Sequence, residues 1–146
     1  MQLPFVCRVL PDTPIVPIVM GSQTLHTIEA LAADLVRALA GRRALLVASS
    51  DLSHYFDVER AAGLDAHVVD YIDRFDTTGL LDKMQRYPEA ECGRFVACGG
   101  GPMVCVIRAA QALGATRSSV LKRGDSGDVS GDKTQVVGYL AAVIGR

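Results

Sequence analysis

The sequence predicts an α/β fold, with a mixed or mostly parallel sheet flanked by helices. Two apolar segments, residues 14–20 and 44–49, are rich in β-branched or aliphatic side chains, as buried strands are. Residues 22–40, between them, repeat apolar side chains at steps of three and four, which is typical of an amphipathic helix. A strand, a helix and a strand in this order form a βαβ unit, whose two strands are parallel.

Composition limits the range of functions. The chain has 146 residues, of which 49% are hydrophobic, which suits a single domain over residues 1–146. The net charge is −1 and the basic residues form no stripe, so nucleic acid is not an expected partner. No apolar run approaches the ~20 residues that span a bilayer, and the start lacks the pattern of a signal peptide. We therefore expect a cytoplasmic protein that makes no membrane contact and keeps its four cysteines as free thiols.

The remaining elements follow from apolar spacing and from breakers. Pro4 and Pro11 make residues 1–13 irregular, and Pro17 places the strand 14–20 at an edge or a bulge. Further helices are predicted from apolar stripes and capping residues, over 58–75, 77–87 and 103–113. Loops are predicted over 88–101 and 123–133, and strands over 118–122 and 134–144.

The strand 44–49 leads into a polar turn that carries the first candidate residues, Asp51 and His54. In parallel sheets ligands bind beyond the carboxyl ends of the strands. At a spacing of three residues in a helical turn, a carboxylate can orient an imidazole, so His54 is a candidate acid or base oriented by Asp51. The alternative is that Asp51 caps the following helix and His54 is a solvated surface residue.

A second candidate is Cys98, which precedes three glycines and Pro102 at the start of a predicted helix. Glycines allow a ligand to approach the backbone, and a thiol near free backbone N–H groups suits reactivity or metal binding. The alternative is a buried, inert cysteine, which is the expected role of Cys105. The loop 124–132 alternates glycines with acidic residues but lacks calcium-loop spacing, so we expect a solvated loop or a lid there.

Several of these motifs together resemble one known family. The sequence contains SSDLSHY at 49–55, CGGGP at 98–102 and SGDVSGD at 126–132, in that order along the chain. This set is similar to the motifs of the Memo family, whose bacterial and archaeal members are also called AmmeMemoRadiSam system protein B. The resemblance covers essentially the whole chain and corresponds to the C-terminal half of a Memo-like domain.

The resemblance implies a part of a three-layer sandwich of the LigB/Memo type, distantly like the class III extradiol dioxygenases. It also implies a pocket like a non-haem metal site, to which Asp51, His54 and Cys98 contribute. In this interpretation Cys98 is a metal ligand, and His54 and Asp51 are catalytic. The implied activity is redox or dioxygenase-related, and the alternative is a non-catalytic adaptor that binds a peptide or a small ligand.

The chain also departs from the family. Two histidines that line the family's pocket from its N-terminal half have no counterpart here. One thiol and one imidazole with a nearby carboxyl make a poor complete site for iron or copper, so we expect weak or absent binding of these metals. A strand without a neighbour would leave a sheet edge open, which favours a homo-oligomer.

Overall fold

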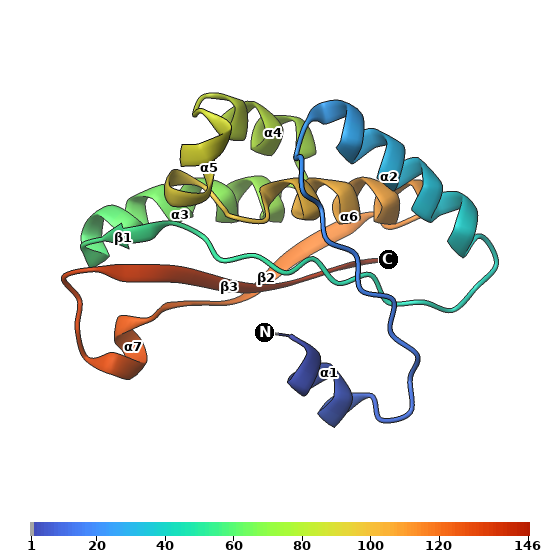
Figure 1. Cartoon of the computed structure of the whole chain (residues 1–146), viewed down its shortest axis with the longest axis horizontal. Coiled ribbons are helices and arrows are strands. Elements are labelled where there is room, and N and C mark those ends of the chain that lie inside the picture. Colours follow the sequence, from blue (N-terminus) through green and yellow to red (C-terminus); the bar gives the residue numbers. More distant parts are fainter. Residues whose placement is uncertain (1) are drawn as a thin grey trace.

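The structure is a computed structural model that describes residues 2–146, apart from the side chain of Glu89. In this part of the chain the backbone forms seven helices, five of which gather on one side of a small sheet (Figure 1). These five are α2 (Leu25–Leu39), α3 (Val58–Asp73), α4 (Thr77–Gln85), α5 (Glu89–Phe95) and α6 (Gly100–Ala112). The other two are α1 (Leu3–Val9) and α7 (Gly127–Ser130).

Side-chain caps explain where three of the helices begin. The side chains of Thr24, Asp57 and Asp76 each accept a hydrogen bond from the backbone N–H three residues later, at the starts of α2, α3 and α4. Such caps satisfy N–H groups that have no partner within the helix. The helices predicted over 22–40, 58–75, 77–87 and 103–113 are confirmed as α2, α3, α4 and α6, with ends shifted by a few residues.

The sheet has three strands in the order β1-β3-β2: β1 (His54–Phe56), β2 (Arg117–Asp125) and β3 (Val136–Gly145). Both pairings are antiparallel, so the predicted mixed or mostly parallel sheet is wrong for the described residues. The reason is local. A short connection that contains α7 joins β2 to β3, and strands joined by a short connection pair antiparallel, whereas parallel strands need a long crossover.

The two segments expected to form parallel strands, 14–20 and 44–49, are not strands in the structure. Pro17 has no N–H to give to a ladder, and within the described chain the ladders join only β1 to β3 and β2 to β3. Burial still alternates along the second segment: Leu46 packs against the core, whereas Leu45 and Val47 are exposed. The period of two is that of a strand with one packed face, but it is not stabilised by ladder hydrogen bonds.

Three stretches expected to be irregular contain helices, one of them the predicted loop 123–133, which holds α7 and the end of β2. Of residues 1–13, Met1 lies outside the described residues, and α1 begins at Leu3. Within the predicted loop 88–101, α5 forms after Pro88 and buries Cys92 against the core. The fixed φ of proline suits the start of a helix, so Pro88 ends one helix and introduces the next.

The helices form two tiers above the sheet (Figure 1). Helices α3 and α6 contact the strands, and α2 and α4 pack on α6. The core lies between these elements and includes the fully buried side chains of Ile28, Leu52, Val68, Leu80, Val96 and Val104. Layers of helix on both sheet faces are not formed by the described residues, so the three-layer sandwich stays a prediction. No helix in the described part is long and apolar enough to cross a membrane.

The exposed apolar side chains predict self-association. Val16 and Val19 are 82% and 94% exposed on the segment 14–20, and Phe5 and Val9 are exposed on α1. Exposed apolar patches mark interaction surfaces, because burying them releases water. We expect dimers or larger species in sedimentation velocity at raised concentration, and a shift toward monomer in Val16→Lys/Val19→Lys. The matched control is Val129→Lys on α7, at an equally exposed position. A wild-type chain that stays monomeric at all concentrations would contradict this prediction.

Candidate functional site

The turn that carries Asp51 and His54 is held by its two inner residues. Leu52 and Ser53 are buried, and their backbone groups bond to β3: Leu52 N donates to Gly138 O, and Gly138 N donates to Ser53 O, each at 2.9 Å. Ser53 N also donates to Asp65 Oδ1 at 2.9 Å. The turn is therefore fixed to both the sheet and α3, which leaves the flanking side chains of Asp51 and His54 free to meet the opposite loop.

The loop that carries Cys98 packs directly against this turn. Cys98 N donates to Asp51 O at 3.2 Å, and Gly99 N donates to Ser50 Oγ at 2.8 Å. A side chain at Gly99 would not fit, because its Cβ would lie 2.5 Å from Ser49 O and 2.9 Å from Ser50 Cβ. The glycine after Cys98 therefore allows the two segments to approach closely enough to bring Cys98 to Asp51.

Gln23, which precedes the N-cap residue of α2, also holds the loop that carries Cys98 in place. Its amide nitrogen donates to Cys98 O at 2.9 Å, and its carbonyl oxygen accepts from Gly101 N at 2.7 Å. The two bonds bracket the beginning of α6 and fix the position of the Cys98 backbone. Gln23 was not predicted, because a single glutamine before a helix carries no recognisable pattern.

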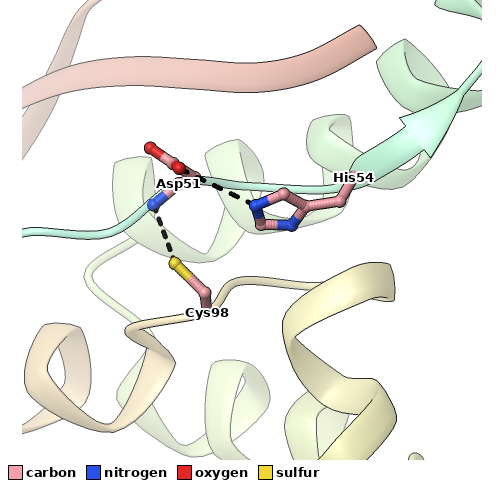
Figure 2. Close-up of side chains that lie close together, drawn as sticks. All are labelled: Asp51, His54 and Cys98. Carbon is pink, nitrogen blue, oxygen red and sulfur yellow. Dashed lines mark hydrogen bonds and ion pairs between the residues drawn. The ribbon is translucent and has the colours of Figure 1, made fainter. Parts of the chain in front are cut away.

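The structure brings together the three residues that the sequence singled out. Side-chain ligand atoms of Asp51, His54 and Cys98 all lie within 4.8 Å of one another. Figure 2 shows Asp51 and His54 on one segment, with Cys98 reaching them from the facing loop. His54 Nε2 lies 3.7 Å from Asp51 Oδ2, and Asp51 N donates to Cys98 Sγ at 3.2 Å.

A backbone carbonyl orients the imidazole of His54. Its Nδ1 lies 2.7 Å from Gly93 O, and because a carbonyl only accepts, Nδ1 carries the proton and donates it. In the neutral ring Nε2 then has a free lone pair, directed to the side of Asp51. A second partner that fixes the tautomer in this way is usual for metal-binding histidines. Gly93 was not anticipated, since a backbone acceptor leaves no trace in a sequence.

The donor set fits a transition-metal ion. In a tetrahedral site with ordinary bond lengths, ligand atoms lie roughly 3.3–3.6 Å apart. The separation of 3.7 Å between His54 Nε2 and Asp51 Oδ2 is close to this value. All three ligand atoms lie within 4.8 Å of one another, so a small movement of the side chains would bring them to such distances. Thiolate and imidazole suit copper, zinc and iron. With three protein ligands, a tetrahedral ion here would keep one position open for an outside ligand.

Asp65 supports the site and was also missed. It is 5% exposed and lies on the buried face of α3 with Ala61, Val68 and Ile72. Its hydrogen bond from Ser53 N is a direct link between α3 and the turn next to His54. The signal in the sequence is an acidic residue at helical spacing from apolar ones, since a carboxyl in such a stripe needs a buried partner.

The acidic loop 124–132 has its own cation. Lys133 Nζ lies 2.8 Å from Asp125 Oδ1 and 2.6 Å from Asp128 Oδ1. The hydrogen bonds to Asp125 and Asp128 raise the pKa of Lys133, and the bond from Lys133 lowers the pKa of Asp128. Lys133 thus supplies the positive charge that faces the carboxylates of Asp125 and Asp128.

The other titratable candidates are apart from the cluster. Cys105 is buried in α6, as predicted, and burial raises the pKa of its thiol. His26 and His67 are exposed on α2 and α3. Among the residues that the structure describes, only Asp51, His54 and Cys98 form a cluster of metal-ligating side chains.

Comparison of the sequence with known proteins assigns the chain to a family. The profile of the family described as Memo-like protein matches residues 1–143. The chain belongs to the Memo family. A MEMO1 family protein of Methanosarcina mazei is 42% identical over 98% of this chain, and one of Methanosarcina acetivorans is 40% identical over the same share. A MEMO1 family protein of Methanobrevibacter smithii is 35% identical over 97% of the chain.

The Memo relatives are longer than this chain. The matched region makes up 52% of the Methanosarcina mazei protein and 49% of the Methanobrevibacter smithii protein, so the chain spans about half the length of the relatives it matches. The family assignment that the SSDLSHY, CGGGP and SGDVSGD motifs suggested is confirmed.

Proposed function

We propose that Cys98, His54 and Asp51 form an open non-haem metal centre that binds iron or copper. The observation that carries the proposal is that three different donor groups lie within 4.8 Å of one another. They come from two segments of the chain, and Cys98 follows His54 by 44 positions. In this proposal the thiolate of Cys98, Nε2 of His54 and the carboxylate of Asp51 are the ligands.

The contacts around the cluster support a ligand role for each residue. Gly93 O holds the His54 ring with Nε2 free, and Gln23 and Ser50 fix the loop of Cys98. The side chains of His54 and Asp51 are 16% and 26% exposed, so both are partly screened from water but accessible to an ion. Preformed, partly desolvated donors bind an ion with less reorganisation than flexible surface residues.

An open position gives such a centre a chemical use. A structural metal site is closed by four protein ligands, whereas a catalytic site keeps a place for water, dioxygen or substrate. Redox or dioxygenase-related chemistry is the activity we infer for the loaded centre. As a ligand His54 has no ring nitrogen left for proton transfer, because Nδ1 donates to Gly93 O. The carboxylate oxygen of Asp51 that does not bind the metal is then the group placed to hold a proton beside the bound molecule. With only three ligands from this chain, we expect weak binding.

Metal titration of the purified chain tests the proposal. Competition with a chromogenic chelator, under anaerobic and reducing conditions, measures uptake of Fe(II) and of Cu(I). We expect about one ion per chain. Cys98→Ser and His54→Gln should each weaken metal binding by more than roughly 10–100-fold, which is the loss typical of removing a residue that only hydrogen-bonds to a ligand.

Two variants serve as matched controls. Cys7→Ser removes an exposed thiol on α1, and His67→Gln removes an exposed imidazole on α3. Neither should change uptake, and circular dichroism should show all four variants folded. Equal uptake by Cys98→Ser and Cys7→Ser would refute the ligand role of Cys98. Oxygen consumption by the iron-loaded chain, compared with Cys98→Ser, tests the inferred activity.

A further inference from the structure

A pocket of about 390 Å³ opens beside Cys98, on the side of α4 and α5. Its walls include Leu81, Met84 and Gln85 from α4, Tyr87 from the turn that follows, and Ala97 next to Cys98. The volume is within the ~300–1,000 Å³ that small-molecule sites occupy. Cys98 belongs both to this pocket and to the candidate metal cluster, and so links the two.

The residues that line the pocket disfavour charged ligands. Of the lining side chains that the structure describes, none is acidic, basic or a histidine. Leu81, Met84 and Ala97 are buried apolar residues. A charged ligand would lose part of its hydration in this pocket without gaining a counter-ion, which is unfavourable beside apolar walls. An uncharged ligand avoids this cost and gains from contact with the apolar walls.

Two lining residues offer hydrogen bonds. The amide of Gln85, which is exposed, and the hydroxyl of Tyr87 line the pocket and can donate or accept hydrogen bonds. The Tyr87 ring is fixed in place, because it stacks on Phe95 with centroids 4.7 Å apart and planes 4° from parallel. Met84 has an adaptable thioether that fits ligands of varied shape. A few polar groups among apolar walls are typical of sites that orient small ligands.

We propose that this pocket binds a small uncharged molecule with an aromatic or aliphatic body and one hydrogen-bonding group. The molecule lies between α4 and α5 with one end beside Cys98. The proposal rests on the proposed metal centre, because it assigns the pocket to the ligand on which that centre acts. The position is suitable: Gly93 also lines the pocket, and its carbonyl holds the imidazole of His54.

A neutral fluorescent probe tests occupancy without any metal. N-phenyl-1-naphthylamine is uncharged, aromatic and carries one N–H group, and its emission rises in apolar surroundings. Titrated into the metal-free chain, it should bind in the pocket. Gln85→Glu adds a charge at nearly constant shape and should weaken binding about tenfold, equivalent to ~1.4 kcal/mol. Ala90→Phe places bulk at an exposed lining position and should weaken it similarly.

Matched variants exclude binding elsewhere. Gln135→Glu makes the same change at an exposed site before β3, and Val19→Lys alters the exposed apolar segment 14–20. Both should leave the pocket-specific part of the signal unchanged. A second readout is alkylation by iodoacetamide, followed by mass spectrometry of the cysteine peptides. The probe should slow alkylation of Cys98 but not of the exposed Cys7.

The outcomes separate this proposal from the metal centre. Probe binding that falls in both Gln85→Glu and Ala90→Phe, with protection of Cys98, supports the pocket even if metal titration fails, and then favours a ligand-binding role without metal. Binding that is insensitive to both variants, or that leaves Cys98 alkylation unchanged, overturns the pocket even if the metal centre is confirmed.

Discussion

Replacing Gly138 with alanine is expected to destabilise the chain by about 2–5 kcal/mol, the sum of overpacking and a strained buried hydrogen bond. A Cβ at this position would overlap Asp65 Oδ2 and lie 2.7 Å from Asp65 Cγ. Asp65 has no room to retreat, because it is buried and accepts the hydrogen bond from Ser53 N. The clash would push β3 away from α3 at the point where both hold the turn of the candidate site.

Urea denaturation followed by circular dichroism measures this effect. Gly145→Ala is the matched control, since it lies in the same strand and its Cβ would have no atom within 4 Å. We expect Gly145→Ala to be neutral or slightly stabilising, because alanine reduces the freedom of the unfolded chain. Equal midpoints for the two variants would contradict the close packing of Gly138 on Asp65.

Replacing Asp65 with alanine is expected to damage both stability and the metal centre. Ser53 N would lose its hydrogen bond to Asp65 Oδ1 in a fully buried position, which costs about 1–3 kcal/mol. The turn that carries Asp51 and His54 would also lose its link to α3. We expect metal binding to weaken roughly 10–100-fold, as it does when outer partners of a site are removed, although Asp65 is not in the cluster.

Two further variants distinguish positioning from general damage. Asp65→Asn keeps an acceptor oxygen at the same place and should recover most of the metal affinity. Asp70→Ala removes an exposed carboxyl on the same helix, whose pair with Arg74 contributes about 0–1 kcal/mol, and should leave the centre intact. If the folded fraction of Asp65→Ala binds metal with the affinity of the wild type, Asp65 has only a structural role.

The helices could be predicted because their signals are local. In α2 a Thr cap precedes apolar residues at steps of three and four, and α3 and α4 follow Asp caps. A capped amphipathic segment carries most of the information for a helix in its own residues. Helix α5 was missed because it is short and its stability depends on burying Cys92 and packing Phe95 on Tyr87, which are contacts made only in the folded chain.

The predicted strands 118–122 and 134–144 are confirmed as β2 and β3. The other strand predictions are wrong, because a strand needs a partner as well as a composition. The segments 14–20 and 44–49 have β-branched or aliphatic side chains, yet neither pairs in the described chain. His54–Phe56 looks like a polar turn, yet it pairs with β3 through Val136 and Val137. Pairing depends on which residues come together across the fold, and this information is not local.

The sequence by itself determined the family, the capped helices and the three reactive residues, because motifs and helical periodicity depend on neighbouring residues. Only the tertiary structure decided that Cys98 meets Asp51 and His54, that Gly93 O sets the imidazole tautomer, and that Asp65 supports the turn from α3. Each of these contacts joins residues at least ten positions apart, through backbone groups or buried side chains. Packing of the whole chain brings such groups within hydrogen-bonding distance, so no short stretch of sequence specifies them.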